Sequence, residues 1–135
     1  MSGNLLQFYI TDNIGTINIP NSIPRQTLRL KQYTFQWKDG DTASANASRI
    51  VLFDTDWLSQ QQCLLARSDG KGVSYFSFLN PSTNGVVVNC DISVAMSKDM
   101  PRQFSYSLKD RNNVAFADGD LLAAYFVFEY DYVIN

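Results

Sequence analysis

The residues of this chain best suited to chemistry are carboxylates in closely spaced pairs. Asp54 and Asp56 follow an apolar run two positions apart, so in an extended chain both side chains point to the same side. The same spacing recurs at 39–41 and at 118–120. Such pairs suit a calcium site or an acid–base pair, but turn chemistry, in which Asp accepts nearby backbone amides, explains them equally. Turn chemistry is preferred, because no single loop carries the dense oxygen ligands of a strong calcium site.

Histidine is absent from the whole chain. Its absence excludes the serine and cysteine triads that depend on an imidazole base, and most zinc or copper sites. Two cysteines cannot form a structural zinc site alone, and the seven glycines stand singly or in turns rather than in a phosphate-binding loop. The sequence therefore predicts no enzyme, with no catalytic, cofactor-binding or metal-binding residues.

Trp57 stands beside the acidic pair in a segment expected to be a loop. An aromatic ring next to carboxylates is typical of a sugar-stacking platform, so Trp57, Asp54 and Asp56 are the candidate ligand-binding residues. Core packing is the simpler explanation for most of the other aromatic residues, because they stand at alternating positions of extended segments.

The two cysteines, Cys63 and Cys90, lie in apolar, strand-like surroundings. Two buried thiols are the favoured interpretation. A disulfide between them stays open, because it requires Cα atoms within about 7 Å of each other.

Charge and hydropathy exclude two classes of partner. The chain has 13 acidic and 11 basic residues, and the basic ones are scattered from Arg25 to Arg111 without a cluster or tail. Direct nucleic-acid binding is therefore not expected. No run of about 18 apolar residues occurs, so no membrane span is predicted. Twelve of the acidic residues are Asp, which favours turns, and Glu129 is the only Glu.

The elements that must position these residues are strands. Extended segments are predicted at 5–10, 14–19, 26–37, 49–53, 63–66, 73–79, 86–96, 103–109 and 121–134. The segment 56–62 is predicted as a short helical turn capped by Asp56, and 68–72 as a hairpin loop.

Three of these segments carry specific predictions. In 26–37 the apolar face changes side near Lys31-Gln32, which predicts a bulge. In 86–96 the six even-numbered residues from Val86 to Met96 form one apolar face, and in 103–109 the residues Phe104, Tyr106 and Leu108 do so. The last segment alternates Leu122, Ala124, Phe126, Phe128 and Tyr130 with further apolar residues, which predicts a central strand.

Evenly spaced strands of this kind predict an all-β fold, an antiparallel two-sheet sandwich. An eight-stranded jelly roll is favoured, as a single domain over 1–135 in which 1–25 is left open as an N-terminal extension or arm. An immunoglobulin-like sandwich is the alternative, but the usual tryptophan between two bridging cysteines is missing.

Several segments of the sequence are similar to those of a known protein family. They are LRLKQY at 28–33, the strand around 85–94, QFSYSLKD at 103–110, Gly119-Asp120-Leu121 and FVFEY at 126–130. In these segments the chain resembles the single jelly-roll capsid proteins, of penton or minor capsid type, of double-stranded DNA viruses. The resemblance is a pattern of strands rather than a sharp motif.

The resemblance implies a structural protein of the virion, assembled inside the host cell, whose partners are other capsid subunits. It implies a homo-oligomer, with a pentamer favoured, and no cofactor. The missing basic arm fits a vertex or minor component rather than the main shell. The alternative is a lectin-like or receptor-binding β-sandwich module of a fibre or tail, motivated by Trp57 with its neighbouring carboxylates and by the polar loops 42–48 and 82–85.

Overall fold

The computed structural model describes residues 4–38, 50–59, 63–66, 68–70, 73–79, 85–110, 114–117 and 119–131. The strands are β1 (Asn4–Ile10), β2 (Ile14–Asn18), β3 (Thr27–Trp37), β4 (Ile50–Asp54), β5 (Cys63–Leu65), β6 (Val73–Leu79), β7 (Val88–Ala95), β8 (Gln103–Lys109) and β9 (Leu121–Tyr130). Each segment predicted to be extended overlaps one of these strands.

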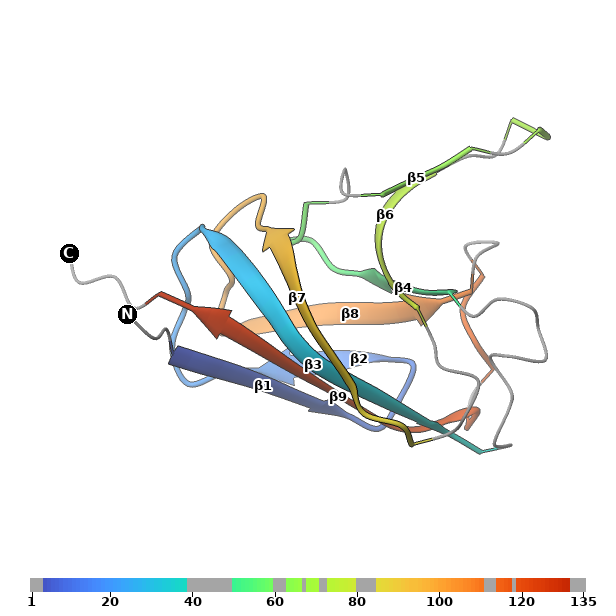
Figure 1. The fold of residues 1–135 in the computed structure, drawn as a ribbon, viewed down its shortest axis with the longest axis horizontal. Coiled ribbons are helices and arrows are strands. Elements are labelled where there is room, and N and C mark those ends of the chain that lie inside the picture. Colours follow the sequence, from blue (N-terminus) through green and yellow to red (C-terminus); the bar gives the residue numbers. More distant parts are fainter. Residues whose placement is uncertain are drawn as a thin grey trace.

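The strands form two sheets that pack face to face (Figure 1). One sheet has the order β1-β9-β3-β7 and the other the order β2-β8-β4-β6-β5. All the pairings are antiparallel. The predicted all-β, antiparallel two-sheet sandwich is confirmed.

The strand order is that of a jelly roll. β1 pairs with β9, β2 with β8, β3 with β7 and β4 with β6, so the chain folds back on itself as one long ribbon. The further pairings of β3 with β9 and of β4 with β8 join the windings of this ribbon into two sheets. Residues 4–25, left open above as part of an extension or arm, instead supply β1 to one sheet and β2 to the other.

The predicted bulge in β3 is confirmed. Leu30 pairs with Phe128 of β9 while Gln32 pairs with Val127, so Lys31 is an extra residue relative to β9. The extra residue reverses the phase of alternation along the strand. As a result the apolar residues on both sides of it are buried in one core: Leu28, Leu30, Tyr33, Phe35 and Trp37.

The predicted phase of β8 is also confirmed. Phe104, Tyr106 and Leu108 are buried in the core, whereas Gln103 and Ser105 are exposed and Ser107 is half-buried. Strict alternation places one face of this strand toward the opposite sheet and the other toward solvent.

β9 is central in its sheet, between β1 and β3, as its composition predicts. Its first residues depart from the predicted phase: Leu121 is buried, and Leu122 is 47% exposed. The register between β3 and β9 shifts between Gln36 and Trp37, and this shift places Leu121 opposite Trp37. The alternation of buried and exposed residues along the rest of β9 therefore predicts the wrong face for Leu121 and Leu122.

β7 is an edge strand, and its apolar face is less buried than the sequence predicts. Val94 and Met96 are buried as predicted, but Ile92 is 45% and Val86 is 40% exposed. β7 has a partner, β3, on one side only, so inward-facing residues along it stay open to solvent.

The short helical turn predicted from Asp56 is wrong for its described part, which extends to Ser59. Asp56 and Trp57 form a turn, and Leu58 then makes an antiparallel bridge to Met96. The amide of Ser59 donates to the carbonyl of Ala95 over 2.9 Å. Residues 60–62 lie outside the described part of the chain.

β5 and β6 form a hairpin, as predicted around 68–72. The described loop residues include Gly70 in the left-handed region, with φ of 77°, which a glycine adopts without strain. Figure 1 shows β5 and the adjoining end of β6 projecting away from the two packed sheets.

Candidate functional site

The structure places Trp57 inside the sandwich. The side chain is 0% exposed, and its ring packs edge-on against Phe8 and Phe104, with centroids 6.4 and 5.4 Å away. A wholly buried ring cannot offer a face to a sugar, so the interpretation of Trp57 as an exposed stacking platform is corrected. Its indole nitrogen has no hydrogen-bond partner among the residues that the structure describes.

Asp54 and Asp56 line the same surface hollow beside β8, but each carboxylate is paired with a different lysine. The Nζ atom of Lys109 contacts the carboxylate of Asp54 at 3.1 Å, and that of Lys98 contacts the carboxylate of Asp56 at 2.9 Å. Between them, the hydroxyl of Thr55 donates to the carbonyl of Ser105 over 2.8 Å. Each carboxylate therefore has its own lysine, an arrangement that suits surface ion pairing rather than shared acid–base chemistry.

The structure gives no support to a metal centre among the residues it describes. In those ranges no group of three or more Asp, Glu, Cys or His residues is placed to hold a metal ion. Asp39, Asp41 and Asp118, which belong to the other closely spaced pairs, lie outside the described residues. The described segments also include no helix long and apolar enough to cross a membrane.

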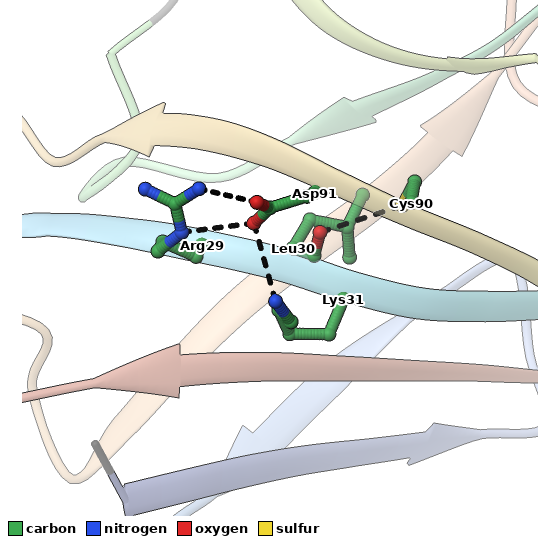
Figure 2. Close-up of polar contacts among 5 residues, drawn as sticks. All are labelled: Arg29, Leu30, Lys31, Cys90 and Asp91. Carbon is green, nitrogen blue, oxygen red and sulfur yellow. Dashed lines mark hydrogen bonds and ion pairs between the residues drawn. The ribbon is translucent and has the colours of Figure 1, made fainter. Parts of the chain in front are cut away.

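Cys90 carries a free thiol that is half-buried rather than buried as predicted. Its Sγ atom lies 3.4 Å from the backbone carbonyl oxygen of Leu30 (Figure 2). Burial raises the pKa of the thiol, and the neighbouring charge of Asp91 raises it further. The side chain of Cys63 lies outside the described part of the structure.

A charged cluster on β3 and β7 was not singled out from the sequence. Arg29 donates from Nε and Nη2 to the two carboxylate oxygens of Asp91, at 2.8 and 2.5 Å, and Lys31 donates to the same group at 3.3 Å. Figure 2 shows both cations converging on Asp91 from β3. The hydrogen bonds from Arg29 and then from Lys31 lower the pKa of the Asp91 carboxyl.

This cluster holds β3 against β7 at the bulge. Asp91 lies between the paired positions Leu30–Ile92 and Gln32–Asn89, where the register shifts. Both cations engage the Asp91 carboxylate, so the cluster links the two strands. Sequence reasoning could not find it, because the register that opposes these residues is not visible in either strand alone.

A groove follows the open side of the sandwich, between the edge strands β1 and β2. One end is lined by residues of both strands together with Tyr106, and the other end continues toward Pro20 and Tyr130. The two parts adjoin, because Gln7, Asn18 and Ile19 line both.

Large apolar side chains are exposed beside this groove. Tyr9 is 65% exposed and Leu5 is 58% exposed, both on β1, and Ile14 at the start of β2 is 56% exposed. The ring of Tyr9 packs edge-on against Tyr125 at a centroid distance of 6.0 Å, and the Tyr125 hydroxyl donates to the side-chain oxygen of Gln7. Sequence analysis missed this surface because it left 1–25 open as an extension and assigned β1 no role.

Comparison of the chain with models of protein families, with curated proteins and with solved structures gave no match.

Proposed function

We propose that the protein is a structural subunit of a viral capsid, of the vertex (penton) or minor capsid type, that acts through contacts with other shell subunits. The observation that carries the proposal is the strand order, β1-β9-β3-β7 in one sheet and β2-β8-β4-β6 in the other. This is jelly-roll topology, an architecture used by viral capsid proteins and by lectins.

The character of the domain supports a structural role. Its core extends through both sheets, from Phe8 in β1 to Phe128 in β9, and it includes residues of β3, β4 and β8. A close-packed interior of this kind resists deformation, which suits a unit that must make the same contacts repeatedly.

Charge supports protein partners over nucleic acid. The net charge is −2, and no cluster of basic residues occurs in the sequence. The best-defined basic pair, Arg29 and Lys31, is engaged with Asp91. A vertex or minor component that contacts protein fits this surface better than a main-shell subunit with a nucleic-acid-binding arm.

We do not propose the lectin-like or receptor-binding alternative. Its main motive is an exposed Trp57, but the ring lies in the core and each neighbouring carboxylate is paired with a lysine. Its other motive, the polar loops 42–48 and 82–85, lies outside the described residues except for Gly85.

Native mass measurement of the purified protein, together with protein identification in disrupted virions, tests the proposal. We expect a discrete homo-oligomer, with a five-membered ring favoured, and the presence of the chain in virions. A strict monomer that is absent from virions would contradict it.

A further inference from the structure

We infer that β1 is a self-association edge, through which two copies of the chain pair in antiparallel fashion about a two-fold axis at Gln7. The inference is independent of the proposed capsid role, because it concerns one strand edge and its partner.

The free edge of β1 lacks the features that normally prevent strand addition. The sequence of β1, NLLQFYI, has no charged residue and no proline, and its ladder with β9 runs without a register shift. Proteins usually protect exposed edges with charges, prolines, bulges or very short strands. β1 has seven residues and none of these devices.

The other edge strands differ from β1. β7 carries Asp91, and its end is covered where Leu58 bridges Met96 and Ser59 bonds Ala95. β2 has five residues with Gly15 among them, and β5 has three. Among the edges in the described part of the chain, β1 therefore combines length with absence of charge.

The exposed side chains of β1 indicate that the partner is a second copy. Leu5 and Tyr9 stand at equal distances on either side of Gln7, on the outward face of the strand. In an antiparallel pair centred on Gln7, Leu5 of each copy lies opposite Tyr9 of the other. Directly opposed side chains have Cβ atoms about 4.5–5.5 Å apart, and aromatic–aliphatic pairs at this distance are stabilising.

The centre of this arrangement is also self-complementary. Gln7 would lie opposite its own symmetry mate, and an amide side chain has both donors and acceptors to offer an identical group. Two-fold pairing would join two four-stranded sheets into one continuous sheet. Two-fold symmetry is also the commonest closed symmetry of homo-oligomers. Because such a contact is isologous, it differs from the head-to-tail contacts of a five-membered ring.

The test uses sedimentation of the full-length chain over a wide range of concentrations. We expect concentration-dependent two-fold pairing of the wild type, and at least about tenfold weaker pairing for Leu5→Lys/Tyr9→Lys, because each lysine then faces a lysine of the partner. Leu5→Lys/Tyr9→Glu should restore the dimer, since each lysine then faces a glutamate. The control Val87→Lys/Val114→Lys changes two other exposed apolar residues and should leave the dimer intact.

Far-UV circular dichroism of each variant establishes that it is folded. Dimerisation that is equally weak in the Lys/Lys and Lys/Glu variants, or equally strong in both, would overturn the inferred register. A wild-type protein that sediments as a ring without a dimer would overturn this inference and leave the capsid proposal standing. A β1-dependent dimer that is absent from virions would support this inference and contradict the capsid proposal.

Discussion

The hydroxyl group of Tyr106 in β8 donates a hydrogen bond of 2.6 Å to the backbone carbonyl of Asp12. Asp12 lies where the chain passes from β1 in one sheet to β2 in the other, so this bond ties the crossing to the core of the second sheet. The next residue, Asn13, is buried; its carbonyl accepts from the amide of Leu108 at 2.7 Å, and its side-chain amide donates to the carbonyl of Phe116.

Tyr106→Phe removes the hydroxyl and leaves the ring in place. We expect it to lower the free energy of unfolding by about 0.5–1.5 kcal/mol, the usual net value of one hydrogen bond. Urea denaturation measures the change. An unaltered midpoint would show that water replaces the phenol at the Asp12 carbonyl without loss.

Gly15→Ala should be coupled to Tyr106. A Cβ atom at position 15 would stand 3.1 Å from the Tyr106 hydroxyl oxygen and 3.3 Å from Cε1, which is closer than ordinary contact. In the wild type we expect this crowding to offset the gain of about 0.5–1 kcal/mol that alanine normally brings to a strand. In the Tyr106→Phe background the oxygen is gone, so the same change should be more favourable by at least about 0.5 kcal/mol. Strictly additive effects in a double-mutant cycle would be inconsistent with this contact.

Leu108 and Ser107 are a matched pair on β8. Leu108 is 0% exposed, so Leu108→Ala should destabilise the fold by about 2–5 kcal/mol through lost burial and the cavity left behind. Ser107→Ala, on the outer face, should change stability by no more than about 0.5 kcal/mol. Thermal unfolding of both variants compares them directly, and similar losses at the two positions would contradict the burial of this strand.

Trp57 offers a test of its buried indole nitrogen, which is unpaired within the described part of the chain. Trp57→Ala should cost about 3–5 kcal/mol, because a large ring is lost from the core. Trp57→Phe should cost clearly less, since it keeps an aromatic ring against Phe8 and Phe104 and removes a buried donor without an acceptor. Chemical denaturation reports both values, and equal losses would show that the ring of Phe cannot fill the site.

Cys90 should react slowly with thiol reagents. Burial raises the pKa of its thiol, so at any pH below that pKa less of it is the reactive thiolate than for an ordinary cysteine. In a Cys63→Ser variant, in which Cys90 is the remaining cysteine, we expect the pH profile of alkylation to be shifted to higher pH in the folded protein. The denatured protein is the control, and superimposable folded and denatured profiles would refute the shift.

Much of the fold prediction depends on the alternation of apolar and polar side chains along each extended segment. Phe104, Tyr106 and Leu108 were assigned to the core from their spacing, and the bulge in β3 from a change of phase at Lys31-Gln32. Side chains alternate strictly along an extended chain, so these features depend on neighbours in sequence and are readable from it. The same rule misjudged Leu122 and Ile92, whose exposure depends on a register shift and on an edge position.

The candidate site was far less predictable than the strands. Asp54 and Asp56 are two residues apart, yet their lysine partners lie 55 and 42 positions away, and Trp57, which follows Asp56, turns into the core. Arg29 and Asp91 meet across two strands separated by 62 positions. None of these contacts leaves a periodic signal in the sequence.

Side chains a few positions apart are enough to show that the chain is built of strands, where most of the strands run and which face of each is apolar. Which strands are neighbours depends on the three-dimensional fold, and so do the interior position of Trp57, the contact of Asp91 with Arg29 and the open edge of β1. Strand pairing joins residues from distant parts of the chain, and any of several pairings would satisfy the same local alternation.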